Sequence, residues 1–487
     1  MSILPVKESP CYPQRKGNIA IPYIDGEKAM ARIFEAIRDA KSSVWLTMCY
    51  ATIHYKLPSL NKSIIEILSD VSQKENMDVK ILAWRSKAIR GDFEGTRKEF
   101  KTLTDLHCKA KIRWDCNKLG CHHQKIFIID GQTAFVGGIN MSEDFIDSCA
   151  HDRKHPHPTH DLFCEIRGPA VSDVIKNFAQ RWNGASEKEK RRGSFPRDKR
   201  PGDIMEPPEQ LPPIAGSNIK VQVTRTIPKG AYKADDIEKG EFSIRESYLN
   251  AIRGAKRYIY LENQYFFDKV SHYSVIRELI RAAYRGVRIF IVLPGNPDFT
   301  KLLSKEFLRE VKNHPNIYVY TLATSYEESK GKDKYRYNDI YVHAKMFIVD
   351  DEWYSIGSAN ISYQSLRTDS EMNVAVWDRA GAKKLRQELW KEHLEYSDTH
   401  KKQYGQEVII DGPVGKAFDQ WWFFARANRY HRKTETEAEN RLLPLDIKKY
   451  TLLKKGLGFV VEYVFRKPFK GLAGAIGWFI ERVREYT

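Results

Sequence analysis

The chain has 487 residues, of which 42% are hydrophobic and 29% are charged, a composition typical of a globular protein large enough for two core-bearing lobes. Its formal net charge of +17 favours an anionic partner, either nucleic acid or an acidic membrane surface, and does not choose between them. The seven cysteines are an odd number and a poor disulfide framework, and the first residues contain no apolar run of signal-peptide length. We therefore expect a cytoplasmic or peripheral membrane protein, or a secreted effector exported without a cleaved signal peptide.

The first predicted lobe comprises residues 1–183. A helix is expected after Asp25, because apolar residues recur at helical spacing as far as Ile37. Runs of strand-forming residues then predict strands at 44–46, 79–82 and 111–114. Strands that alternate with helical stretches indicate an α/β lobe.

A basic segment separates this lobe from a second one. Residues 184–217 combine clustered lysines and arginines with six prolines, which predicts a linker without a core of its own. Residues 218–412 then repeat the alternating pattern, with helices expected at 244–255 and 275–284 and strands at 258–262 and 287–293. The tyrosine-rich segment 325–341 is expected to be a loop. The predicted fold class is α/β, with two similar α/β/α lobes related by a pseudo-twofold axis.

Residues 413–487 form a predicted basic, aromatic tail with fifteen Lys and Arg against eight Asp and Glu. Apolar residues recur at helical spacing in 457–465 and 469–483, but both runs are too short and too charged to span a membrane. Two interpretations remain open. The runs are either helices that pack on the second lobe or amphipathic helices that lie in an anionic membrane surface.

Two short stretches, 220 residues apart, share the pattern H-x-K-x4-D. The first contains His123, Lys125 and Asp130, and the second contains His343, Lys345 and Asp350. A small residue and an asparagine follow each stretch at the same spacing, namely Gly138 and Asn140, then Ser358 and Asn360. Two copies in register indicate a duplicated half-site and one active centre built from both.

The duplicated residues suit the chemistry of a phosphodiester. Two lysines and two asparagines can hold the non-bridging oxygens and stabilise the charge that builds on them. One histidine can attack phosphorus while the other protonates the leaving alcohol. No metal or other cofactor is expected for this step, because the lysines supply positive charge. Asp130 and Asp350 begin turns, so we assign them, with Gly138 and Ser358, to supporting the motif.

These motifs resemble those of the phospholipase D superfamily, and further segments extend the resemblance to its lipid-acting branch. The segments are Thr159-His160-Asp161, the strand Ile259 to Phe266 with its E-N-Q-Y-F sequence, and Asp369-Ser370-Glu371. The family usually has a tryptophan where this chain has Thr159. The resemblance implies that Asp161 and Glu371 orient the two catalytic imidazoles.

By this resemblance we expect a phospholipase D that hydrolyses the headgroup phosphodiester of glycerophospholipids through a phosphohistidine on His123, with His343 as the acid. Transfer to an alcohol is a second possible outcome. The alternative is a phosphatidyltransferase of the cardiolipin or phosphatidylserine synthase type, ranked second because the N-terminal spanning helices usual in cardiolipin synthases are not seen in this sequence. A nuclease ranks lower still. The expected partners are phospholipid and an anionic membrane surface but no nucleic acid, and we expect a monomer.

Two groups of residues could suggest a metal site. Cys108, Cys116, Cys121 and His122 have irregular spacings that do not match zinc motifs. The histidines at 151, 155, 157 and 160 are expected to lie in a polar loop. The sequence therefore predicts no metal site.

Overall fold

The computed structural model describes residues 3–7, 10–49, 51–52, 55–57, 61–84, 109–115, 120–151, 157–185, 203–232, 237–267, 274–296, 302–303, 307, 309–310, 313–328, 334–395, 414–447 and 451–452. Residues 186–202 of the predicted basic linker, the apolar runs of the tail, Cys108 and Cys116 lie outside the described residues. The predicted limits of lobes, linker and tail stay predictions.

The first lobe is built on a seven-stranded mixed sheet. Its strand order is β6 (Lys111–Asp115), β5 (Asp78–Trp84), β2 (Ser43–Met48), β7 (Lys125–Ile129), β8 (Thr133–Gly137), β10 (Leu162–Arg167) and β1 (Arg15–Ile24). The first three strands are parallel and the rest are antiparallel to their neighbours. The covering helices are α1 (Gly26–Asp39), α2 (Ile64–Ser72) and α4 (Ala170–Gly184).

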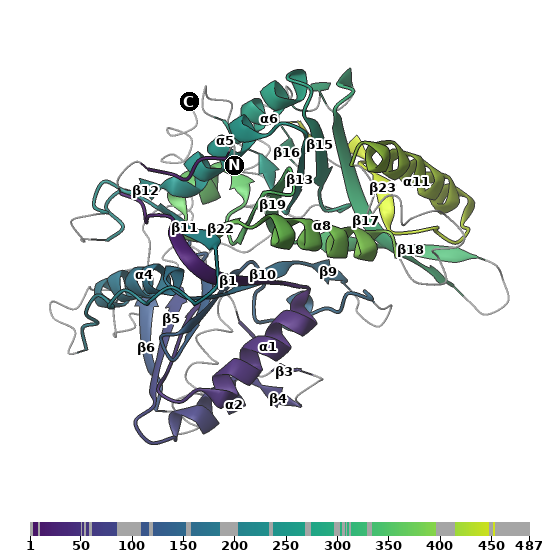
Figure 1. The fold of residues 1–487 in the computed structure, drawn as a ribbon. Helices are drawn as coiled ribbons and strands as arrows, with labels where there is room; N and C mark the ends of the chain where they lie inside the picture. Colours follow the sequence, from purple (N-terminus) through teal and green to yellow (C-terminus); the bar gives the residue numbers. More distant parts are fainter. Residues whose placement is uncertain are drawn as a thin grey trace, which may run out of the picture.

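The second lobe repeats this sheet strand by strand. Its order is β17 (Ile317–Glu327), β15 (Arg288–Val292), β13 (Tyr258–Asn263), β19 (Lys345–Val349), β20 (Trp353–Gly357), β22 (Glu371–Trp377) and β11 (Ile219–Ile227), with the same pattern of parallel and antiparallel pairs. The matching helices are α5 (Ser243–Gly254), α6 (Val275–Tyr284) and α8 (Arg379–His393). The prediction of two similar α/β lobes is thus confirmed (Figure 1).

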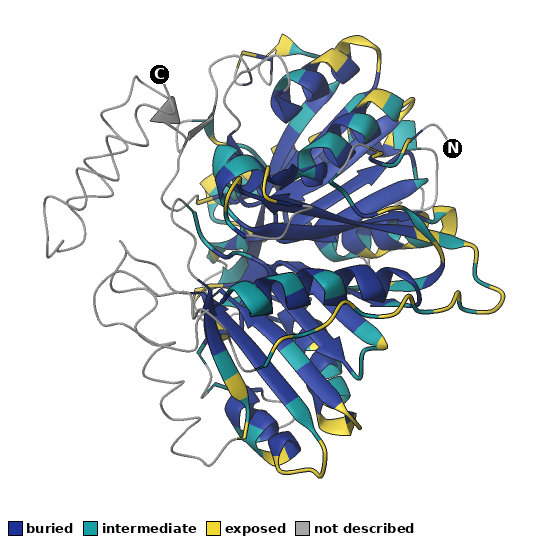
Figure 2. Ribbon diagram, turned by 90° about the vertical axis from the view of Figure 1, so that its left-hand side faces the viewer, coloured by how far each residue is buried: buried dark blue, intermediate teal, exposed yellow. Residues whose placement is uncertain are grey.

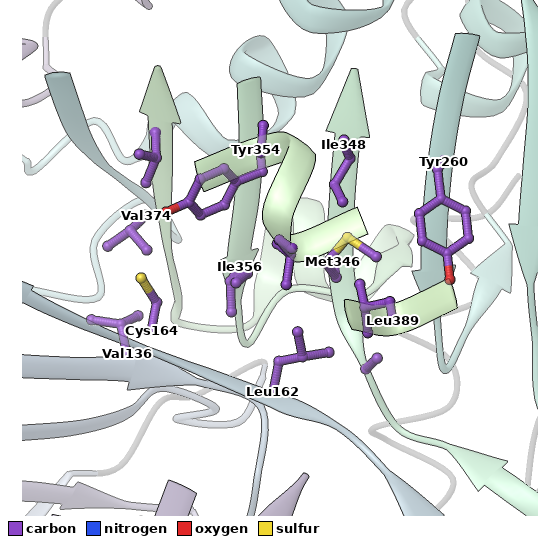
Figure 3. Packing of buried hydrophobic residues seen from close by; sticks show 14 of the residues in the cluster. Val136, Leu162, Cys164, Tyr260, Met346, Ile348, Tyr354, Ile356, Val374 and Leu389 are labelled. Carbon is purple, nitrogen blue, oxygen red and sulfur yellow. The ribbon is translucent and has the colours of Figure 1, made fainter. Parts of the chain in front are cut away.

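The two sheets meet at their last strands, because β1 pairs antiparallel with β11 from Arg15↔Val221 onward. One apolar cluster fills the space between the lobes, with side chains of both sheets, α4 and α8. Figure 3 shows Leu162 of the first lobe below Ile356 and Met346 of the second. Separate clusters lie under α1 and α2 and under α5 and α6, so each sheet is buried on both faces (Figure 2).

The segment 325–341 is not the predicted loop. Strand β17 continues to Glu327, and β18 (Tyr335–Val342) pairs with it antiparallel from Leu322↔Ile340 to Glu327↔Tyr335. The prediction was wrong because charged residues were read as a loop signal, whereas tyrosines at every second position fit a strand with one exposed face. The strand delivers the chain directly to His343.

The first part of the predicted tail packs on the second lobe. Helix α11 (Val414–Thr434) buries Phe418 and Trp421 against the interlobe cluster, and β23 (Leu442–Pro444) pairs with β17. Among the described residues, no helix is long and apolar enough to cross a membrane.

Short elements complete the two lobes. They are β3 (Lys56–Leu57), β4 (Lys62–Ser63), η1 (Glu143–Phe145), β9 (Thr159–His160), β12 (Glu241–Phe242), β14 (Phe266–Phe267), β16 (Leu302–Leu303), β21 (Ile361–Ser362), η2 (Gln364–Thr368) and β24 (Thr451–Leu452).

Candidate active site

The first motif histidine is held by an acid from the opposite lobe. His123 lies just before β7, and its Nδ1 is 3.0 Å from both carboxylate oxygens of Glu371, the first residue of β22. The Ser358 backbone carbonyl lies 3.1 Å from the same nitrogen. A carboxylate on Nδ1 fixes the ring orientation and leaves Nε2 as the nitrogen available for chemistry.

The second histidine has the mirrored arrangement. His343 lies just before β19, and its Nδ1 is 2.5 Å from Asp161 Oδ2, which belongs to the first lobe. The backbone repeats this crossing, because His123 N donates to the Ser370 carbonyl at 2.9 Å and His343 N donates to the His160 carbonyl at 2.8 Å. Each histidine is therefore bound, through ring and backbone, to the two-residue segment that carries the other lobe's acid.

The two lysines lie beneath the histidines. Lys125 Nζ donates to the His123 carbonyl at 2.9 Å, and Lys345 Nζ donates to the His343 carbonyl. Both lysine side chains are buried. The two asparagines follow β8 and β20, and the buried carbonyl oxygen of each, Asn140 Oδ1 and Asn360 Oδ1, has no hydrogen-bond partner among the described residues. The structure therefore brings two imidazoles and two ammonium groups together at the junction of the lobes, and the two carboxamides follow the neighbouring strands.

Burial makes the second half-site electrostatically unusual. It raises the pKa of Asp161 to about 7 and lowers the pKa of Lys345 to about 7. Burial, followed by the charges of Lys345, Lys125 and His123, also lowers the pKa of His343 well below its ordinary value. Lys125 and His123 belong to the first motif, yet their charges act on His343 of the second. The two half-sites therefore share one electrostatic environment. His123 is the more accessible histidine, with 16% of its side chain exposed against 3% for His343.

The motif aspartates lie at the far ends of the strands. Asp130 accepts three backbone hydrogen bonds from residues 41–43, at 2.7 to 3.0 Å. Asp350 does the same for residues 256–258, at 2.7 to 2.9 Å. Among the described residues, neither aspartate is hydrogen-bonded to a motif histidine, and both tie the start of the neighbouring strand, β2 or β13, to the motif strand.

Gly138 and Ser358 occupy matching places behind the acids. A Cβ atom on Gly138 would lie 2.5 Å from Asp161 Oδ1, so only glycine lets this carboxylate approach. Ser358 instead donates its hydroxyl to Glu371 Oε2 at 2.5 Å. The duplicated position is thus used once as space and once as a hydrogen-bond donor.

Two residues near the site had no assigned role in the sequence analysis. Gln264, from the E-N-Q-Y-F segment, accepts from Asn360 Nδ2 at 3.3 Å and donates to the Tyr341 hydroxyl at 2.7 Å. Cys49 ends the strand beside the motif, and a thiol hydrogen bond from Cys121, with Lys125 nearby, lowers its pKa to about 6. The E-N-Q-Y-F match could have indicated Gln264, whereas no pattern marked Cys49.

Profiles of known protein families match both lobes of the chain. The profile of a family described as "Cardiolipin synthase, PLD-like domain" matches residues 33–182 and 248–393, more than half of the chain and one match in each lobe. The chain belongs to the phospholipase D superfamily. A second profile of this superfamily, described as "Phospholipase D", matches residues 137–283.

Two similar relatives of this phospholipase D superfamily enzyme are cardiolipin synthases. Cardiolipin synthase 1 of Staphylococcus epidermidis is 28% identical over 400 residues, covering 80% of this chain and 70% of the relative. The major cardiolipin synthase of Bacillus subtilis is 26% identical, covering 74% of this chain and 66% of the relative. The chain thus spans about two thirds of the length of these relatives. The crystal structure of phosphatidylserine synthase from Haemophilus influenzae shares the fold, with a TM-score of 0.51, 13% identity and coverage of 76% of this chain and 85% of that chain.

The prediction of a phospholipid hydrolase is wrong, because these relatives are named for lipid synthesis. The physical reason for the error is that the covalent intermediate expected from the duplicated motif is the same for hydrolases and transferases. The outcome depends on whether water or an alcohol reaches that intermediate, and H-x-K-x4-D does not encode this choice. The expectation about N-terminal spanning helices, on which the transferase was ranked second, does not bear on this choice either.

Proposed function

We propose that this enzyme is a phosphatidyltransferase of the cardiolipin synthase type. The observation that carries the proposal is the crossed pair of histidines, each with Nδ1 bound to the other lobe's acid. Such a pair provides a nucleophile and an acid–base on opposite sides of one phosphorus. The names of the relatives favour an alcohol, and specifically a lipid hydroxyl, as the acceptor.

In the first step, His123 Nε2 attacks the phosphorus of a phosphatidylglycerol, and His343 donates its Nε2 proton to the departing glycerol oxygen. The phosphatidyl group is then bonded to His123. We assign the nucleophile to His123 because it is the more exposed of the two. The charge that develops on the non-bridging oxygens is met by Lys125, Lys345, Asn140 and Asn360.

In the second step, His343 removes the proton from the free glycerol hydroxyl of a second phosphatidylglycerol. That oxygen attacks phosphorus, the bond to His123 breaks, and cardiolipin is released. One phosphodiester is exchanged for another, so no other co-substrate is required. For cardiolipin to form, this lipid hydroxyl must outcompete water at the intermediate.

We also propose that the enzyme contacts an anionic lipid surface through the outer face of α11. Exposed residues recur there at helical spacing, and we call this set the α11 outer face: Trp422, Phe423, Arg426, Arg429, Tyr430 and Lys433. Phe423 and Tyr430 are 65% and 66% exposed, and the Arg426 guanidinium lies 4.4 Å from the Trp422 ring. Exposed aromatics among basic residues are typical of a helix lying in a membrane interface.

The deciding experiment supplies purified enzyme with vesicles of phosphatidylglycerol and identifies the lipid products by mass. We expect cardiolipin and free glycerol in equal amounts, with little phosphatidic acid. Excess glycerol should convert cardiolipin back to phosphatidylglycerol, because the exchange conserves the number of phosphodiester bonds. Phosphatidic acid as the main product at high lipid density would refute the transferase proposal.

A further inference from the structure

A second buried polar cluster lies directly behind Asp161, at the junction of the lobes. The first lobe contributes residues from the start of α1, the segment after η1, and β9, while the second contributes residues from β13 and the end of α8. The members are Asp25, Asp147, His151, His160, Glu262, Glu392 and His393. No side chain in the cluster is more than 5% exposed. His151 and His160 are thus buried within a cluster of charged side chains, whereas the sequence had predicted a polar loop for them.

Four of these side chains converge on one another. One ligand atom from each of Asp25, His151, His160 and Glu392 lies within 4.8 Å of all the others. His160 Nδ1 is 2.8 Å from Asp25 Oδ1 and 3.0 Å from Glu392 Oε1. His151 Nε2 is 3.1 Å from Glu392 Oε1 and 3.6 Å from Asp25 Oδ2. Neighbouring ligands of a tetrahedral zinc ion with bonds of about 2.0–2.2 Å are about 3.4 Å apart, so small shifts would admit an ion.

The far side of each imidazole is held by a further carboxylate. His151 Nδ1 is 2.8 Å from Asp147 Oδ2, and His160 Nε2 is 2.7 Å from Glu262 Oε2. Metal-binding histidines usually donate their second ring N–H to such a carboxylate, which orients the ring and makes the first nitrogen a better ligand. Glu262 is itself fixed by His393 Nε2 at 2.8 Å.

Two carboxylate oxygens of the inner group lack hydrogen bonds. Asp25 Oδ2 and Glu392 Oε2 are fully buried and have no hydrogen-bond partner among the described residues. Buried acceptors are almost always satisfied in folded proteins, so these two atoms call for a cation or donor that protein side chains do not supply. This observation is independent of the spacing of the cluster.

We propose that Asp25, His151, His160 and Glu392 form a binding site for a divalent transition-metal ion of the zinc class. Two imidazole nitrogens and two carboxylate oxygens suit zinc in a closed, four-coordinate structural site. The role of the ion is positional: it joins the lobes and fixes His160, whose carbonyl accepts from His343 N and whose neighbour Asp161 holds the His343 ring.

The test measures binding in the full-length protein. After dialysis against a chelator, the folded protein is titrated with zinc chloride, and bound metal is counted after gel filtration. We expect one zinc ion per chain. We also expect the bound ion to raise the melting temperature by several degrees (about 2–4 °C or more). His151→Gln and Glu392→Gln should each lose the bound ion and the thermal shift.

Three controls make the outcome decisive. His157→Gln changes an exposed histidine of the same segment and should bind zinc normally. The double variant His123→Ala, His343→Ala removes the catalytic imidazoles and should also keep one ion. X-ray absorption on the zinc-loaded wild type should show two imidazole ligands and no sulfur, which covers the case of a variant that does not fold. Folded wild-type protein that binds no zinc, or a catalytic double variant that loses it, would overturn the proposal.

Discussion

The duplicated histidines have unequal surroundings although their motifs match. His123 is partly exposed, whereas His343 is buried beside Phe145, with ring centroids 4.6 Å apart. Burial lowers the pKa of His343, so the charged imidazole that donates the proton in the proposed first step depends on the neighbouring carboxylate of Asp161, 2.5 Å from Nδ1. The two positions are related by the fold, but the chemistry of the two steps assigns them different tasks.

We predict that His123→Ala and His343→Ala each reduce cardiolipin formation by about a thousandfold or more, and that the double variant loses little further. Each histidine performs a task that the other cannot, so removing one stops the cycle. Turnover is measured on phosphatidylglycerol vesicles, with circular dichroism to confirm folding. A single variant that retained about a tenth of the wild-type rate would contradict the two-histidine mechanism.

The pKa of Lys345 gives a pH prediction. The side chain must be cationic to hold phosphate, and its pKa of about 7 means that this charge is lost as pH rises through neutrality. We expect kcat/KM to fall above about pH 7, and kcat to fall only at higher pH because bound phosphate raises the pKa of the lysine.

Lys345→Arg tests this assignment, since a guanidinium stays charged throughout the range. The alkaline fall in kcat/KM should move beyond the measured range even if the rate is lower. Lys125→Arg is the matched control, because it changes the equivalent lysine and leaves Lys345 in place. If kcat/KM of Lys345→Arg fell at the same alkaline pH as that of the wild type, the fall would have to come from the titration of another group.

The offset of 220 residues predicted the histidines, lysines and asparagines, because a repeated spacing survives in the sequence. Asp161 and Glu371 came only from family resemblance. The sequence could not predict that each acid contacts the histidine of the opposite lobe, because this depends on how the two sheets dock and not on a local pattern. Cys49 was missed for the same reason: it reaches the site through the end of a strand and belongs to no motif.

At the scale of elements, apolar periodicity located most helices and strands of both lobes, and α6 spans the predicted residues 275–284. Burial on both faces makes the central strands continuous apolar runs that are easily recognised. The β17–β18 hairpin was missed because its exposed face is charged. The outer face of α11 was missed because the exposed Trp422 and Phe423 stand between the buried Trp421 and Phe424. The sequence cannot tell which of these neighbouring aromatics face the solvent unless the orientation of the helix on the lobe is known.

We predict that the α11 outer face contributes to membrane affinity. Arg426→Gln with Arg429→Gln should weaken binding to anionic vesicles by about 2 kcal/mol, or roughly thirtyfold, at low salt. The matched control is Lys383→Gln with Lys384→Gln, which removes two exposed charges from α8. Binding is measured by vesicle sedimentation, and equal losses in the two variants would show only a general effect of net charge.

The role predicted for the tail can be tested on the whole molecule. Leu445 and Ile447 pack against the core of the second lobe, and β24 (Thr451–Leu452) pairs with β16, so a truncation should follow Leu452. A chain ending there should stay folded, with an unchanged melting temperature. It should act normally on a soluble short-chain lipid and bind anionic vesicles poorly. If the truncated chain lost both stability and activity on the soluble lipid, a membrane role for residues 453–487 would be contradicted.

The pairing of β1 with β11 has a consequence for how the molecule moves. Hinge closure requires a few free backbone residues to absorb the rotation between domains. Here the sheets share backbone hydrogen bonds across their edge strands, and one apolar core fills the space between them. The lobes therefore cannot swing apart during the cycle. We therefore expect lipids to reach the histidines through movements of local side chains and loops, and not through domain closure.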